Sequence, residues 1–149
     1  MKLVRYLSLA LLIAPIWAGE KNLLNLDKTG LALQGYDPVA FFVENKPIKG
    51  RPELRTYYQG AAYYFANLQD KKLFEAEPQK YAPAFGGYCA FGVSRNKLVE
   101  VDVNAFQVVN GRLLLQYSKG VQNDFNKNAM ENLQKADRYW PVLLEKKGK

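Results

Sequence analysis

The sequence has no histidine, one cysteine and two methionines among its 149 residues. Histidine is the commonest general base near neutral pH and the commonest metal ligand, so its absence excludes Ser–His–Asp catalysis, Cys–His catalysis and a zinc site of cysteine and histidine. Because a single cysteine cannot form an intramolecular disulfide, packing alone must hold the fold, and ten Tyr, eight Phe and two Trp can supply its core. We therefore predict a non-catalytic protein.

The N-terminus has the pattern of a secretory signal peptide. Lys2 and Arg5 precede an apolar run, residues 6–17, and Ala18 supplies a small residue at a cleavage point. The run is shorter than the roughly 18 residues that a membrane-spanning helix needs. Residues 1–18 are therefore predicted to be cleaved, leaving an exported, periplasmic or secreted protein with no transmembrane segment; an uncleaved membrane anchor is the alternative.

The rest of the chain is expected to form one domain, since no repeat, low-complexity tract or linker interrupts it. Its positive charge, +7 over the full sequence, favours anionic surfaces but says nothing about the fold. Nucleic acid is not an expected partner, because no recognition motif is present. The predicted boundaries are a lead-in segment at 19–29, the domain at 30–145 and a solvated basic tail at 146–149.

Two hairpins are predicted from turn residues between runs of strand-forming residues. Asn110-Gly111 separates two apolar runs, and Asn-Gly is the strongest short-range hairpin signal because both central residues of a type I′ turn need positive φ. The other hairpin is rich in tyrosine and turns at Gly60. The strands expected are residues 55–59 with 61–65, and 106–109 with 112–117.

Helices are predicted from capping residues and from apolar spacing. Asp37 and Asn67 are placed to cap short helices. From Val121 to Trp140 apolar residues recur at steps of three and four, which predicts a C-terminal helical region that Pro141 ends or kinks. The order of strands and helices lacks regular βαβ alternation, so the fold class is α+β: a small single domain with two antiparallel hairpins, short helices and a C-terminal helical region.

The order and spacing of several segments resemble those of the YHS domain family. The chain is more closely similar to the exported single-domain branch of that family. The likeness runs from about Gly30 to Pro141. The segments that carry it are Gly35–Ala40, Tyr63–Ala66, Leu73–Tyr81 and Gly86–Ala90.

What the resemblance implies is a fold rather than an activity. YHS domains are related to small metal-binding modules, in which one cysteine follows the Asp-Pro-Val element and two more lie around the start of the helix after the hairpin. The corresponding positions here are Ala40, Ala66 and Asp70, none of which is a thiol. The metal role of those positions therefore does not carry over to this chain.

Cys89, in the segment Gly86-Gly87-Tyr88-Cys89, is the first candidate site residue. Its thiolate could hold a soft metal ion such as Cu(I), with Met130, a second protomer or an external ligand completing the site. It could instead be a buried small apolar residue, or a thiol that pairs with another chain or undergoes redox chemistry. All three interpretations remain open from the sequence.

The residues before Cys89 are candidates for ligand contact. The backbone N–H groups of Gly86 and Gly87 could cradle an anion, with Arg95 and Lys97 nearby to help; a tight turn that fits Tyr88 into the core explains the glycines equally.

The function predicted from the sequence is an exported, non-catalytic YHS-like binding protein. It would take a metal ion, such as copper, or a small ligand near Cys89, with contacts from Tyr88, Gly86 and Gly87. The alternative is a structural or protein-interaction module that has lost the metal site.

Overall fold

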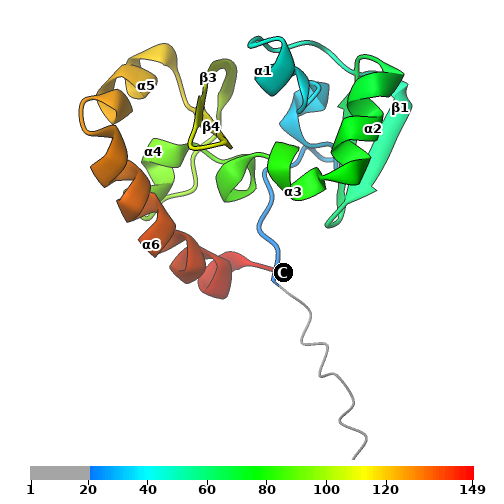
Figure 1. The fold of residues 1–149 in the computed structure, drawn as a ribbon. Helices are drawn as coiled ribbons and strands as arrows, with labels where there is room; N and C mark the ends of the chain where they lie inside the picture. Colours follow the sequence, from blue (N-terminus) through cyan, green and yellow to red (C-terminus); the bar gives the residue numbers. More distant parts are fainter. Residues whose placement is uncertain (1–20) are drawn as a thin grey trace, which may run out of the picture.

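The computed structural model describes residues 21–149 (Figure 1). The predicted signal peptide lies outside the described residues. Among the helices from residue 21 onward, none combines the length and the apolar character that crossing a membrane requires.

The N-terminal half is built around the tyrosine-rich hairpin. Strand β1 pairs antiparallel with β2, with Tyr58 opposite Ala61, and the turn between them places Gln59 and Gly60 at positive φ. Helix α2 packs on this hairpin, and Asn67 caps it by accepting the N–H of Asp70 at 2.8 Å, as predicted. The elements of this half are η1 (Leu33–Gly35), α1 (Ala40–Val43), β1 (Arg51–Tyr58), β2 (Ala61–Phe65), α2 (Leu68–Ala76) and α3 (Pro78–Tyr81).

The C-terminal half contains the second hairpin and the longest helix. Asn110 and Gly111 both adopt positive φ between β3 and β4, which confirms the predicted turn. Ser118 caps α5 by accepting the N–H of Val121 at 3.2 Å. The elements of this half are η2 (Ala84–Gly87), α4 (Ala90–Val93), β3 (Asp102–Val109), β4 (Arg112–Gln116), α5 (Lys119–Asn126) and α6 (Ala129–Lys147).

The α+β class is confirmed, with two separate two-stranded antiparallel sheets, short helices and a C-terminal helix. Helix α6 runs through Pro141 to Lys147, so the prediction that this proline could end the helix is wrong. Proline removes one backbone donor, and the remaining hydrogen bonds of a long packed helix hold it. Lys146 and Lys147, in the segment predicted to be a solvated basic tail, form the exposed last turn of α6.

Strand β4 lies between the two hydrophobic clusters of the domain. Leu113 and Leu115 belong to the cluster that holds the aromatic residues of the N-terminal half, whereas Leu114 belongs to the cluster with Phe125 and Leu133. Alternate side chains of a strand point to opposite faces, so this one strand contributes to both cores.

The lead-in segment passes between the two halves, and the C-terminus ends beside its start (Figure 1). Asn22 and Lys149 exchange two backbone hydrogen bonds of 3.0 Å each. The two ends of the described chain are thus joined at the lower edge of the domain.

Candidate functional site

Cys89 is buried at the start of α4, with only 1% of its surface exposed. Its thiol donates to Oε1 of Gln116 at 3.3 Å, and its sulfur accepts the backbone N–H groups of Gly92 at 3.4 Å and Tyr117 at 3.3 Å. Cys89 is therefore the N-cap of α4 and connects this helix to the end of β4. This geometry favours the interpretation of Cys89 as a packed residue.

The surroundings of the sulfur offer no second metal ligand. Its hydrogen-bonding partners are one amide side chain and two backbone N–H groups. Across residues 21–149, no three Cys, Asp or Glu side chains gather as a metal-binding group. Met130 is 56% exposed on α6. Copper binding at Cys89 stays a prediction, which would need ligands from outside the described residues.

Gln116 is a buried polar residue that the sequence analysis did not single out. It is fully buried, and its Oε1 accepts from Cys89 and from the N–H of Phe91 at 3.0 Å. Its Nε2 has no hydrogen-bond partner in the part of the chain that the structure describes. The apolar residues before Gln116 in β4 gave no indication in the sequence that this polar side chain would be buried.

The Gly-Gly-Tyr segment holds the lead-in segment in place. The carbonyl oxygens of Gly86 and Gly87 accept from the backbone N–H and the side-chain Nδ2 of Asn25, at 2.8 and 3.3 Å. The Tyr88 hydroxyl donates to the carbonyl oxygen of Leu24 at 3.4 Å, and burial raises the pKa of this hydroxyl, which keeps it a neutral donor. The contacts of these three residues are thus with the chain itself.

Ala40, Ala66 and Asp70 lie around the buried carboxyl group of Asp37. Asp37 accepts the N–H groups of Val39 at 2.8 Å and Ala40 at 3.3 Å through Oδ1, and that of Ala66 at 2.8 Å through Oδ2. Burial, together with the neighbouring Asp70 carboxyl, raises the pKa of Asp37 to about 6 against the lowering effect of the N–H groups. Asp37 was predicted to be the N-cap, but α1 begins at Ala40 and its N-cap position is Val39.

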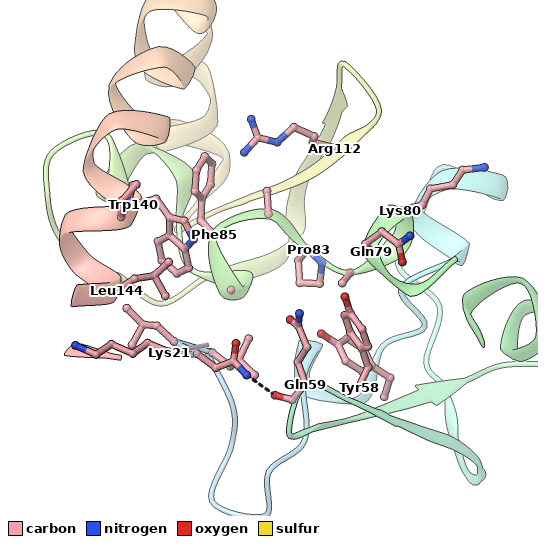
Figure 2. Close-up of a pocket in the computed structure, with 18 of the residues that line it drawn as sticks. Lys21, Tyr58, Gln59, Gln79, Lys80, Pro83, Phe85, Arg112, Trp140 and Leu144 are labelled. Atoms are coloured by element: carbon pink, nitrogen blue, oxygen red, sulfur yellow. Dashed lines mark hydrogen bonds between the residues drawn. The ribbon is translucent and has the colours of Figure 1, made fainter. Parts of the chain in front are cut away.

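A cleft of about 690 Å³ separates the two halves of the domain (Figure 2). On the side of the N-terminal half, Tyr58 and Tyr63 line it. Phe85 and Trp140 line the opposite side, with their ring centroids 5.9 Å apart in an edge-to-face arrangement. The α3–η2 connection, which includes Pro83, bounds the cleft between them.

The charges nearest the cleft are largely neutralised by partners. Arg112 makes two hydrogen bonds with the carboxylate of Asp137, at 3.1 and 2.9 Å, and its guanidinium lies 5.0 Å from the centre of the Phe85 ring. Lys21 pairs with Glu145 at 2.9 Å. Both pairs are partly exposed, so they contribute little to stability, but they leave the cleft with little net charge.

Amide groups supply the remaining polar lining. The side chains of Asn22, Gln59 and Gln79 border the cleft, and the Asn22 side chain donates to the carbonyl oxygen of Gln59 at 3.2 Å. Figure 2 shows the ammonium group of Lys80 pointing away from the centre of the cleft. The cleft thus combines aromatic walls with neutral hydrogen-bonding groups.

Of the four site residues predicted from the sequence, only Gly86 lines this cleft. The cleft is formed by segments that lie far apart in the sequence, from the lead-in to α6. No single local motif marks it, but two signals could be found in the sequence: the tyrosine-rich first hairpin, whose Tyr58 and Tyr63 line the cleft, and Trp140, the single Trp of the domain.

Comparison with protein-family models, with curated proteins and with solved structures finds no match.

Proposed function

We propose that the chain is an exported, non-catalytic YHS-like binding protein whose cleft between the two halves takes a small, flat, uncharged organic molecule. The observation that carries this proposal is the cleft itself: about 690 Å³, with aromatic side chains on both sides and with Lys21 and Arg112, two of its three cations, paired with carboxylates.

The size and the lining support this class of ligand. Pockets for small molecules are typically about 300–1,000 Å³ and frequent at junctions between parts of a fold. The lining of this cleft mixes aromatic with polar groups. Aromatic rings favour stacked or edge-to-face contact with another ring. Gln59 and Gln79 add donors and acceptors for a ligand's own polar groups. A charged ligand would have to compete with the Arg112–Asp137 or Lys21–Glu145 pair.

The cleft supports ligand binding better than the surroundings of Cys89 support a metal ion. The sulfur already has three hydrogen-bonding partners and is 1% exposed. A thiolate with no soft co-ligand makes a weak copper site.

A protein-interaction module remains the second candidate. Tyr57 is 70% exposed on β1, and the outer edge of β1 pairs with no other strand in the described range, residues 21–149. An exposed strand edge can accept an additional strand from a partner.

Trp140 gives a direct assay for the cleft. Once residues 1–18 are removed, it is the only tryptophan in the chain. We expect saturable changes in its emission when the mature protein is titrated with flat neutral compounds that do not themselves emit in this range, starting with nicotinamide. Unchanged emission with every compound up to millimolar concentration would count against the proposed function.

A matched pair of variants locates the binding. Gln79→Phe narrows the cleft, whereas Gln69→Phe makes the same change on the exposed surface of α2. Binding should weaken at least tenfold in Gln79→Phe and stay unchanged in Gln69→Phe. Equal affinity in both variants would place the ligand elsewhere.

A further inference from the structure

A second pair of cavities lies on the C-terminal half, and the two share Arg95 and Lys97. The smaller one has a volume of about 200 Å³ and adjoins Cys89. Apart from the two shared cations, its lining is almost wholly apolar: Phe91, Val99, Tyr117 and Val121 provide most of it. It is open to solvent and has room for a short hydrocarbon chain along its apolar wall.

The larger cavity is an open basic groove of about 740 Å³ between the loop after α4 and helix α6. Lys135 and Arg138 reach it from α6, and Arg95 and Lys97 from the loop. No acidic residue lines it. Four positive groups therefore border one groove.

Most of this charge has no carboxylate partner. Lys135 pairs with Glu131 at 2.6 Å, whereas no salt bridge joins Arg95, Lys97 or Arg138 to an acid anywhere in residues 21–149. The hydrogen bond and the charge of Lys135 lower the pKa of Glu131, and the charges of Arg95 and Arg138 lower it further. These cations therefore act together on an anion placed beside them.

Arg95 connects the apolar cavity to the basic groove. Its guanidinium lies 4.7 Å from the centre of the Phe91 ring, and Phe91 lines the apolar cavity. A guanidinium held over an aromatic ring keeps its donors free for a carboxylate or phosphate oxygen.

We propose that these two cavities form one binding site for a single-chain anionic amphiphile. The hydrocarbon chain enters the apolar cavity, and the carboxylate or phosphate head lies between Arg95 and Lys97, facing the basic groove. This site shares no lining residue with the cleft between the two halves, so it stands apart from the proposed function.

A single amphiphile fits the two cavities better than a neutral hydrocarbon or a small anion would. A neutral hydrocarbon would make no charged contact with Arg95 and Lys97, which form no salt bridge in the described residues. A small inorganic anion would leave the apolar cavity unfilled, and its exposed contacts with long cationic side chains would be weak. Only a molecule with both a hydrocarbon chain and an anionic head group can contact the apolar cavity and the two cations that border both cavities.

A ligand series tests this on protein purified from the exported fraction, by calorimetric titration with octanoate below its micellar concentration. Octanoate should bind saturably, and octanol and acetate at least tenfold more weakly. From butanoate to octanoate the affinity should rise by up to roughly fourfold per added methylene, the ratio that corresponds to about 0.8 kcal/mol per buried CH₂. Octanol or acetate binding as tightly as octanoate would overturn the proposal.

Charge variants and vesicles locate the site and identify the source of the head group. Arg95→Gln/Lys97→Gln should lose at least tenfold in octanoate affinity, while Lys71→Gln/Lys72→Gln on α2 should bind as the wild type does. Gln79→Phe should leave octanoate binding unchanged, which separates this site from the cleft. Binding to phosphatidylglycerol vesicles without binding to octanoate would assign the surface to a bilayer instead and overturn the single-chain site.

Discussion

At the residue scale, Asp37 and Cys89 are buried side chains that accept backbone N–H groups at the start of short helices. Asp37 accepts those of Val39 and Ala40 at α1, and Cys89 accepts that of Gly92 at α4. A four-residue helix has almost no internal hydrogen bonds, so it depends on such acceptors and on packing. Replacing either acceptor should therefore affect stability.

Removing the sulfur of Cys89 should lower the free energy of unfolding. Cys89→Ala leaves the N–H groups of Gly92 and Tyr117 and the Oε1 of Gln116 without this partner, at a cost of about 1–3 kcal/mol. Cys89→Ser keeps a donor and an acceptor and should cost less. Urea unfolding measures both; an alanine variant as stable as the wild type would show that these hydrogen bonds do not matter.

The carboxyl of Asp37 should make the protein less stable as pH rises from about 4 to about 6. Its folded pKa, about 6, lies above the ordinary value of 3.8, so the folded state binds the proton more tightly than the unfolded state. The free energy of unfolding falls by at most roughly 3 kcal/mol over this range, and it falls no further from this cause at higher pH.

Asp70→Asn should reduce that loss, because it removes the neighbouring charge that helps to raise the pKa of Asp37. The measurement is urea unfolding at pH 4.5 and pH 7, with the exposed Asp124→Asn as control. An Asp70→Asn variant with the same pH dependence as the wild type would argue against this coupling.

At the element scale, turns and helix starts could be predicted because they depend on residues close together in the sequence. Asn110-Gly111 specified a hairpin because few other residue pairs tolerate two positive φ angles. Asn67 specified a helix start because its side chain reaches the N–H three residues ahead. The candidate Cys89 was found as the lone thiol, although its three partners were not.

Features that depend on distant segments could not be predicted in this way. Whether Pro141 ends a helix depends on what α6 packs against, and the cleft lies between two halves that β4 and the lead-in segment connect by packing in both hydrophobic clusters. The role of Gly86 also depends on a distant segment. It has positive φ, and a Cβ there would overlap the carbonyl oxygen of Leu23 in the lead-in segment.

Gly86→Ala should therefore cost more stability than Gly60→Ala. Both glycines have positive φ, so both variants carry the backbone strain of about 1 kcal/mol, but nothing lies within 4 Å of a Cβ at Gly60. The overlap with Leu23 should raise the total for Gly86→Ala to roughly 3 kcal/mol or more. Thermal unfolding compares the two, and equal losses would mean that the lead-in segment moves aside freely.

At the scale of the whole molecule, the two hydrophobic clusters are expected to unfold together because β4 belongs to both. Leu115 packs in the N-terminal cluster, whereas Trp140 packs against the C-terminal one. Leu115→Ala should cost about 2–5 kcal/mol and shift the Trp140 fluorescence transition in urea as much as the far-UV circular dichroism transition. Leu68→Ala, at a 54% exposed position, should shift neither by much. A Trp140 transition that stays in place in Leu115→Ala would mean that the halves unfold separately.

The cleft between the halves is the feature on which the proposed function depends. The most direct test is a ¹⁵N NMR titration of the chain without residues 1–18, using the compound that most changes Trp140 emission. The largest shifts should fall on the indole Nε1–H of Trp140 and on the amides of Gln79, Phe85 and Gly86, which line the cleft. Largest shifts at Phe91 and Tyr117, or no saturable shifts at all, would contradict a ligand site in the cleft.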